Sequence, residues 1–138
     1  MFNSGSTPVL ERLVQYTSQR HRLILHNIAN LSTPHFRPTD VSPESFQQAL
    51  GEAIDRRRGG GSGGPLELGD TREMRFTQDS VELNPGASHD NLLFHDRNDR
   101  SLDHQMKNLA ENTMAHNAAL ELLRSKFQSI ETAIRERL

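Results

Sequence analysis

The chain has 138 residues, of which 33% are hydrophobic, 25% charged and only 5% aromatic, and it contains neither Trp nor Cys. This is one domain's length with few core-forming side chains, so we expect partners or long packed helices to bury part of its apolar surface. The net charge of −2 excludes the basic field that nonspecific nucleic-acid binding needs, and the lack of Cys excludes disulfides, thiol nucleophiles and Cys-ligated metals.

The first segment, residues 1–34, predicts a helix from about Pro8 to Asn30. Its start lacks the basic residues and apolar run of a cleaved secretory signal. Thr7 is the expected cap, and Pro34 ends the helix because the residue before a proline is pushed out of the helical region. Apolar residues interrupted by Thr17 and Arg20 recur mostly on one face: Val9, Leu10, Leu13, Tyr16, Leu23, Ile24, Ile28 and Leu31.

Residues 35–58 predict an extended connector followed by a short helix. Ser42 and Pro43 repeat the cap-then-proline start, and Arg56–Arg58 suit the negative C-terminal end of a helix. Gly59 is the expected terminator. The apolar stripe of this helix consists of Phe46, Ala49, Leu50, Ala53 and Ile54.

The middle of the chain, residues 59–100, has little pattern. Residues 59–65 form a flexible Gly-rich linker by composition, and no Gly-Lys-Ser/Thr follows to make it a phosphate loop. Residues 66–100 predict an irregular segment with one or two short strands at Met74 to Phe76 and Val81 to Leu83 and a turn at Asn84-Pro85-Gly86. Leu92-Leu93-Phe94 form a small apolar cluster that we expect to pin this segment to a helix.

The last segment, residues 101–138, predicts a single helix about 55 Å long, at 1.5 Å per residue, with Ser101 or Asp99 as its cap. Such a helix cannot be covered by the rest of the chain, so its stripe is expected to meet the N-terminal helix and other subunits. Steps of four and three residues trace a coiled-coil seam through Leu102, Met106, Leu109, Thr113, His116, Leu120, Leu123, Phe127, Ile130, Ile134 and Arg137.

These elements predict a mainly α fold. Two long terminal helices pair as an antiparallel coiled coil, with a short third helix and a loop-rich middle segment that has room for a short β-hairpin. We expect no cofactor, metal site or catalytic residue. None of the seven histidines has the three- or four-residue helical spacing of a metal pair, so His116 is interpreted as a polar seam residue. Asp96, Asn98 and Asp99 lack the Gly and distal Glu of a calcium loop.

Two terminal motifs resemble the flagellar rod and hook axial proteins. Asn27-Ile28-Ala29-Asn30, followed after two residues by Thr33-Pro34-His35-Phe36, is similar to the family's Asn-Ile-Ala-Asn and Thr-Pro-Gly-Tyr. Residues 106–113 are similar to its terminal helix, and residues 122–135 resemble a proximal rod protein in particular. His35 and Arg97 stand where the family usually has glycine, so the first turn must form without glycine's freedom at positive φ.

The resemblance implies a structural subunit of the bacterial flagellar basal body, in the periplasmic proximal rod, exported without a cleaved signal by the flagellar type III apparatus. Implied partners are other copies, the rod proteins FlgC, FlgF and FlgG, the adaptor FliE and the MS ring protein FliF, with no nucleic acid and no membrane insertion. The expected assembly interface comprises Leu13, Ile24, Asn27, Ile28, Ala29, Asn30, Thr33, Pro34, Phe36, Met106, Leu109, Asn112, Leu120, Leu123, Phe127, Ile130 and Ile134.

Other interpretations stay open at this point. Asn27, Ala29 and Asn30 are also the small and amide side chains that let a chain turn out of a helix. A soluble coiled-coil adaptor or secretion chaperone would share the heptads and differ in forming a discrete oligomer, and a metal-dependent enzyme would require bound metal.

Overall fold

The computed structural model describes residues 5–61, 64–87 and 97–137, and the fold within them is mainly helical. These residues form three helices and four short strands. In chain order they are α1 (Thr7–Asn30), β1 (Thr39–Asp40), α2 (Pro43–Gly59), β2 (Met74–Phe76), β3 (Val81–Leu83), β4 (Gly86–Ala87) and α3 (Arg97–Glu136).

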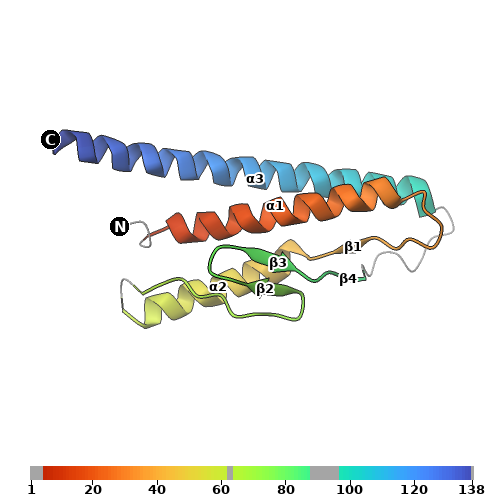
Figure 1. Cartoon of the computed structure of the whole chain (residues 1–138), viewed down its shortest axis with the longest axis horizontal. Coiled ribbons are helices and arrows are strands. Elements are labelled where there is room, and N and C mark those ends of the chain that lie inside the picture. Colours follow the sequence, from red (N-terminus) through yellow and green to blue (C-terminus); the bar gives the residue numbers. More distant parts are fainter. Residues whose placement is uncertain (1–4, 62–63, 88–96, 138) are drawn as a thin grey trace.

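The two terminal helices lie side by side and run in opposite directions, as predicted (Figure 1). Helix α3 has 40 residues, so it is about 60 Å long at 1.5 Å per residue. Helix α1 has 24 residues and covers only part of it. In Figure 1 the C-terminal end of α3 therefore extends well past the first turn of α1.

The hydrophobic core lies on the other side of α1, where α2 and the strands pack against it (Figure 1). Tyr16 of α1 stacks on Phe46 of α2 with ring centroids 4.2 Å apart, and its hydroxyl donates to the Val41 carbonyl at 2.7 Å. Ala49 and Met74 complete the buried cluster. Helix α1 is thus the central element, with the core on one face and α3 on the other.

Strands β2 and β3 form the predicted hairpin, with Met74 paired to Leu83 and Phe76 to Val81. The expected turn at Asn84-Pro85-Gly86 is wrong. Asn84 N–H instead donates to the Glu73 carbonyl at 2.7 Å, and Gly86 continues into β4, which pairs with Asp40 of β1. The connector after α1 is therefore held in a small second sheet that the sequence pattern did not indicate.

The helix ends differ in part from the sequence predictions. Ser42 caps α2 as expected, accepting from Ser45 N–H at 3.2 Å. Thr7 is not the cap of α1, because it is already helical, and Ser6 before it makes no side-chain capping bond. Helix α3 begins at Arg97, so Asp99 and Ser101 lie within it rather than capping it.

The predicted apolar cluster Leu92-Leu93-Phe94 and the residue Asp96 lie outside the described residues. Of the helices described, none is long and apolar enough to span a membrane.

Candidate assembly surface

The face of α1 that meets α3 carries polar side chains among apolar ones. Thr17, Arg20 and Asn27 are 2%, 4% and 0% exposed. They continue the three-and-four spacing of Leu10 and Ile24, so Thr17 and Arg20, the predicted interruptions of the apolar stripe, face the same way as the stripe. Their spacing could have predicted this burial, because a polar residue in register with an apolar stripe lies on the same face of the helix.

The matching face of α3 is offset by about one residue from the expected seam. Gln105, Asn108, Asn112 and Ala119 are buried there, between 1% and 9% exposed. Asn112 Nδ2 donates to the Thr17 carbonyl at 2.8 Å, and the Thr17 hydroxyl lies 2.8 Å from His116 Nδ1. His116 is therefore a polar residue of the helix contact, as predicted. Because polar side chains are buried here beside apolar ones, hydrogen bonds contribute to the specificity of this contact.

Arg20 fastens the connector to α1. Its guanidinium makes two hydrogen bonds to the Asp40 carboxylate, from Nε to Oδ1 at 3.1 Å and from Nη2 to Oδ2 at 2.8 Å. Burial lowers the pKa of the guanidinium, and the hydrogen bonds and charge of Asp40 outweigh that effect, so the pKa of Arg20 is raised overall. This two-point contact holds β1 against α1.

Asn27 makes a second contact between α1 and β1, near the end of α1. Its Nδ2 donates to the Thr39 carbonyl at 2.6 Å, and its Oδ1 accepts from Thr39 N–H at 3.2 Å. Nδ2 also lies 3.4 Å from Gln105 Oε1 on α3. The side chain thus joins α1, β1 and α3 within one chain, so these contacts give Asn27 a structural role inside the subunit. Asn30 turns back instead, donating to the His26 carbonyl at 2.8 Å.

The turn after α1 contains a non-glycine residue at positive φ. His35 has φ of 62°, the left-handed conformation that glycine adopts without a Cβ penalty. Phe36 N–H donates to the Thr33 carbonyl at 3.2 Å, and its ring contacts His26 edge-on at 5.7 Å. The turn therefore forms at positive φ although its residue is His35 and not glycine.

The residues predicted for the assembly interface occupy three kinds of environment. Buried in the contact between the terminal helices are Ile24, Asn27 and Asn112. Half-buried are Leu13, Ile28, Asn30, Phe36, Leu109, Leu120, Leu123 and Ile130, and Leu13 packs against the hydrophobic core. Exposed are Ala29, Thr33, Pro34, Met106, Phe127 and Ile134.

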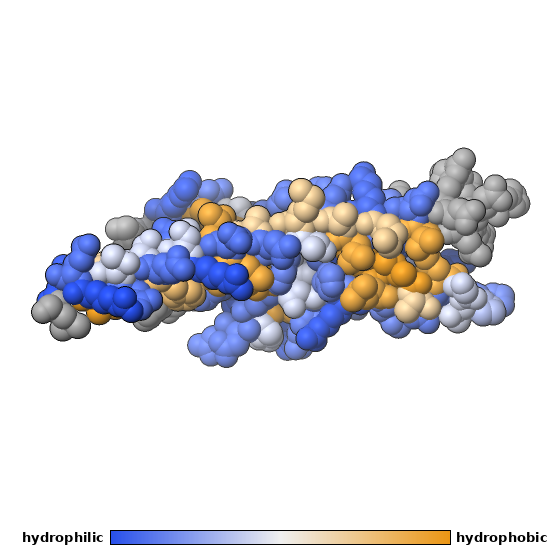
Figure 2. All heavy atoms as spheres, turned by 90° about the horizontal axis from the view of Figure 1, so that it is seen from above, coloured by the Kyte–Doolittle hydropathy of each residue, from blue (hydrophilic) through white to orange (hydrophobic). Residues whose placement is uncertain are grey.

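An apolar surface covers the end of the helix pair where α1 finishes and α3 begins. Figure 2, which looks down on α3, shows hydrophobic side chains gathered at this end and polar ones toward the C-terminus. Four of its members, Leu25, Ile28, Met106 and Leu109, each follow by one position a residue that is buried in the helix pair, and such positions lie on the same side of an antiparallel pair. We call this the apolar face and define it as Leu25, Ile28, Leu102, Met106 and Leu109.

The exposed members of the apolar face are large side chains. Leu25, Leu102 and Met106 are 44%, 41% and 50% exposed, and Ile28 and Leu109 are half-buried between them. Leu25 did not figure in the predicted interface, although its spacing of three residues from Ile28 places both on one flank of α1. Contiguous exposed apolar residues that two helices share indicate an interaction surface.

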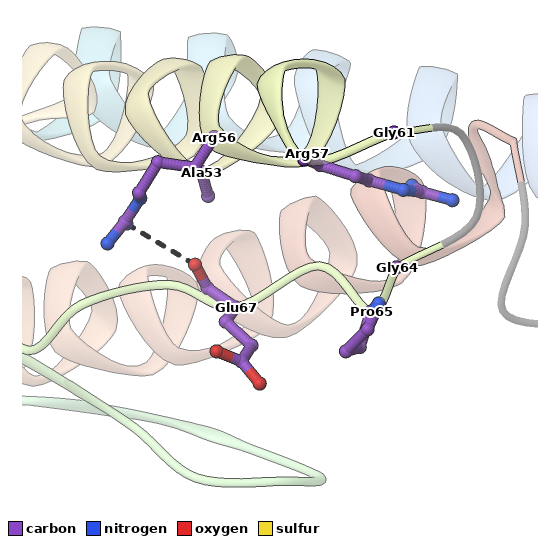
Figure 3. Close-up of a pocket in the computed structure, with 8 residues that line it drawn as sticks. Ala53, Arg56, Arg57, Gly61, Gly64, Pro65 and Glu67 are labelled. Atoms are coloured by element: carbon purple, nitrogen blue, oxygen red, sulfur yellow. Dashed lines mark hydrogen bonds between the residues drawn. The ribbon is translucent and has the colours of Figure 1, made fainter.

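A shallow hollow of about 220 Å³ lies between the end of α2 and the glycine-rich segment (Figure 3). Arg56 and Arg57 extend on either side of it, and both donate to backbone carbonyls, Arg56 to Glu67 at 3.3 Å and Arg57 to Gly5 at 2.9 Å. In the part of the chain that the structure describes, no three His, Asp or Glu side chains gather as a metal site. The apolar face is therefore the stronger candidate for function.

Comparison with known proteins supports the family resemblance that the terminal motifs indicate. No family model matches the chain. The chain is 28% identical over 133 residues to flagellar basal body rod protein FlgB of Bacillus subtilis, covering 95% of this chain and 94% of that protein. It is 26% identical over 136 residues to FlgB of Borrelia hermsii, covering 94% of this chain and 96% of that protein. The resemblance to rod proteins is thus confirmed along almost the whole chain, and the two matches support a FlgB-like rod protein.

Proposed function

We propose that the chain is a structural subunit of the flagellar basal body rod, in its proximal part, where its terminal helices assemble into the shaft that transmits motor torque. The observation that carries this proposal is the end-to-end similarity to two FlgB proteins, which covers at least 94% of each. A match that includes both termini and the middle segment argues for the same role rather than for a shared helical motif.

The distribution of polar and apolar residues supports a role in assembly. Buried amides and hydroxyls hold α1 and α3 together, and large apolar side chains remain on the outside of the pair. Heterologous contacts between copies generate a helical filament when they do not close into a ring. Close-packed helices are poorly compressible, which suits an element that carries torque.

The partners in this proposal are other copies of the chain, the rod proteins FlgC, FlgF and FlgG, the adaptor FliE and the MS ring protein FliF. The subunit reaches the periplasmic rod through the flagellar type III apparatus, without a cleaved signal peptide. In this role the chain needs no cofactor and has no enzymatic activity.

Complementation of a deletion strain tests the proposal. The wild-type gene is expected to restore swimming and to place the chain in isolated basal bodies. Met106→Asp, in the apolar face, is expected to abolish swimming while the chain is still made, because a carboxylate there would be buried at low dielectric on assembly. Met114→Asp is the matched control, since Met114 is 72% exposed on the same helix and outside the apolar face.

Two results would contradict the proposal. One is wild-type swimming in the deletion strain itself. The other is absence of the chain from basal bodies that carry a complete rod.

A further inference from the structure

We propose that Asp70 and Thr71 close the outer edge of β2 and so keep this strand from pairing with a strand of another copy of the chain. The inference goes beyond the proposed function, because it concerns a contact that the subunit avoids and not one that it makes. It rests on the hydrogen bonds between β2 and the segment that precedes it.

Strand β2 has an outer edge with no neighbouring strand in the part of the chain that the structure describes. Its inner edge pairs with β3, which is the strand next to α1 (Figure 1). Met74 and Phe76 lie two residues apart in β2, so their backbone N–H and C=O groups point to the same edge. An open edge of this kind is a template on which the strand of another chain can add.

The two residues Asp70 and Thr71 occupy this outer edge. Phe76 N–H donates to Asp70 Oδ1 at 2.8 Å, and Met74 N–H donates to Thr71 Oγ1 at 3.0 Å. Thr71 N–H donates in turn to the Met74 carbonyl at 2.8 Å. Three polar groups on the outer edge of β2 therefore have partners within the chain, and an incoming strand would have to displace them.

Two of these partners are side-chain oxygens, and this difference ends the sheet. A further strand would present a new row of N–H and C=O groups on its own outer side, whereas a carboxylate or a hydroxyl presents none. The carboxylate of Asp70 also places a charge at the edge, and Arg75 in the middle of β2 is exposed. Charged side chains on an edge strand oppose pairing with another chain.

The second small sheet uses a side chain in the same way. Strand β1 pairs with β4, and both backbone polar groups of Thr39 bond to the carboxamide of Asn27. The carboxamide donates to the carbonyl and accepts from the N–H, as the backbone of a neighbouring strand would. Each of the two sheets thus has backbone groups that a side chain from outside the sheet satisfies.

Two substitutions of Asp70 test the hydrogen bond apart from the charge. Asp70→Ala and Asp70→Asn remove the same charge, but only asparagine keeps an acceptor oxygen at Oδ1. Hydrogen exchange of the Phe76 amide, followed by NMR, is expected to become roughly fivefold faster in Asp70→Ala, which is the effect of losing one hydrogen bond. In Asp70→Asn the rate should stay close to that of the wild type.

Strand addition is measured on the double variant Asp70→Ala/Thr71→Val, which lacks both side-chain acceptors. At high protein concentration it is expected to form aggregates that bind thioflavin T, while the wild type and Asp70→Asn stay clear. Asp79→Ala is the control for charge, because Asp79 is an exposed acidic residue in the loop after β2. Circular dichroism before the incubation verifies that each variant has the helical content of the wild type.

Two results would overturn the inference. One is equal hydrogen exchange of the Phe76 amide in Asp70→Ala and the wild type, which would show that Asp70 does not protect the edge. The other is a folded double variant with fast exchange that stays clear, because the edge would then be open and no strand would add to it. Neither result bears on the swimming of the deletion strain, so the proposed function is tested separately.

Discussion

Among the residues that the structure describes, His35 is the non-glycine residue with a positive φ. Its φ of 62° costs a residue with a Cβ about 1 kcal/mol or more, and glycine avoids that steric cost. We expect His35→Gly to raise the free energy of unfolding by about 1 kcal/mol, measured by urea denaturation followed by circular dichroism. His35→Ala is the control, because it removes the imidazole and keeps the Cβ. An equal gain from alanine would show that the imidazole, and not the backbone, causes the strain.

The buried hydroxyl of Tyr16 should make the free energy of unfolding fall at alkaline pH. Burial raises the pKa of its hydroxyl well above the ordinary value of 10.0, and the charge of Arg20 lowers it by a smaller amount. Because the folded state holds this proton more tightly than the unfolded state, the contribution to stability is fully present below pH 10.0 and is lost as the pH rises above it.

This pH dependence can be measured at a single site, because Tyr16 is the only tyrosine in the chain and there is no tryptophan. We expect the tyrosinate absorbance to rise only together with the loss of helical circular dichroism. In Tyr16→Phe the free energy of unfolding should depend less on pH in the alkaline range, because the ionising hydroxyl is gone. Ionisation near pH 10.0 in a chain that is still helical would contradict the buried environment.

At the scale of elements, sequence periodicity located the helices and the hairpin but not the face of α3 that packs on α1. Apolar spacing found α1, α2, α3 and the β2–β3 pair because each has a local repeat. The buried face of α3 has Gln105 and Asn112, whose hydrogen-bond partners Asn27 and Thr17 are distant in sequence. The β1–β4 pair was missed for the same reason, since two-residue strands have no period.

The apolar face, like the helix contact, could be predicted only in part from the sequence. The terminal motifs drew attention to Ile28, Met106 and Leu109, which the structure places in the apolar face. Leu25 was missed because the face is built by two helices, and its extent depends on their register. Asn27 is a family motif residue, but its contacts with Thr39 and Gln105 lie within one chain.

The two faces of α3 should respond differently to alanine. Asn112→Ala removes a buried hydrogen bond to the Thr17 carbonyl and is expected to lower the free energy of unfolding by about 1.5 kcal/mol. Met106→Ala should change it by less than about 0.5 kcal/mol, because Met106 is 50% exposed in the single chain. Urea denaturation of both variants distinguishes the faces. A larger loss from Met106→Ala would mean that the expected seam, and not the polar one, holds α1 and α3 together.

At the scale of the whole molecule, the small hydrophobic fraction is divided between two places. The core between α1, α2 and the hairpin takes the aromatic pair Tyr16 and Phe46, while the α1–α3 contact is largely polar. Large apolar side chains such as Leu25, Leu102 and Met106 are left about half exposed on the outside of the helix pair. This arrangement is expected of a subunit that buries much of its apolar surface against other subunits.

Self-association should therefore be open-ended. Sedimentation velocity is expected to show a monomer at micromolar concentration and, as concentration rises, a continuous increase in size without a preferred dimer or tetramer, because heterologous contacts between copies that do not close into a ring can continue without limit. Met106→Asp should stay monomeric over the same range, since it places a charge in the apolar face, and Met114→Asp should behave as the wild type. A single dimer or tetramer that forms at micromolar concentration and resists dilution would favour a coiled-coil adaptor or secretion chaperone, for which the exposed apolar residues would serve a closed interface.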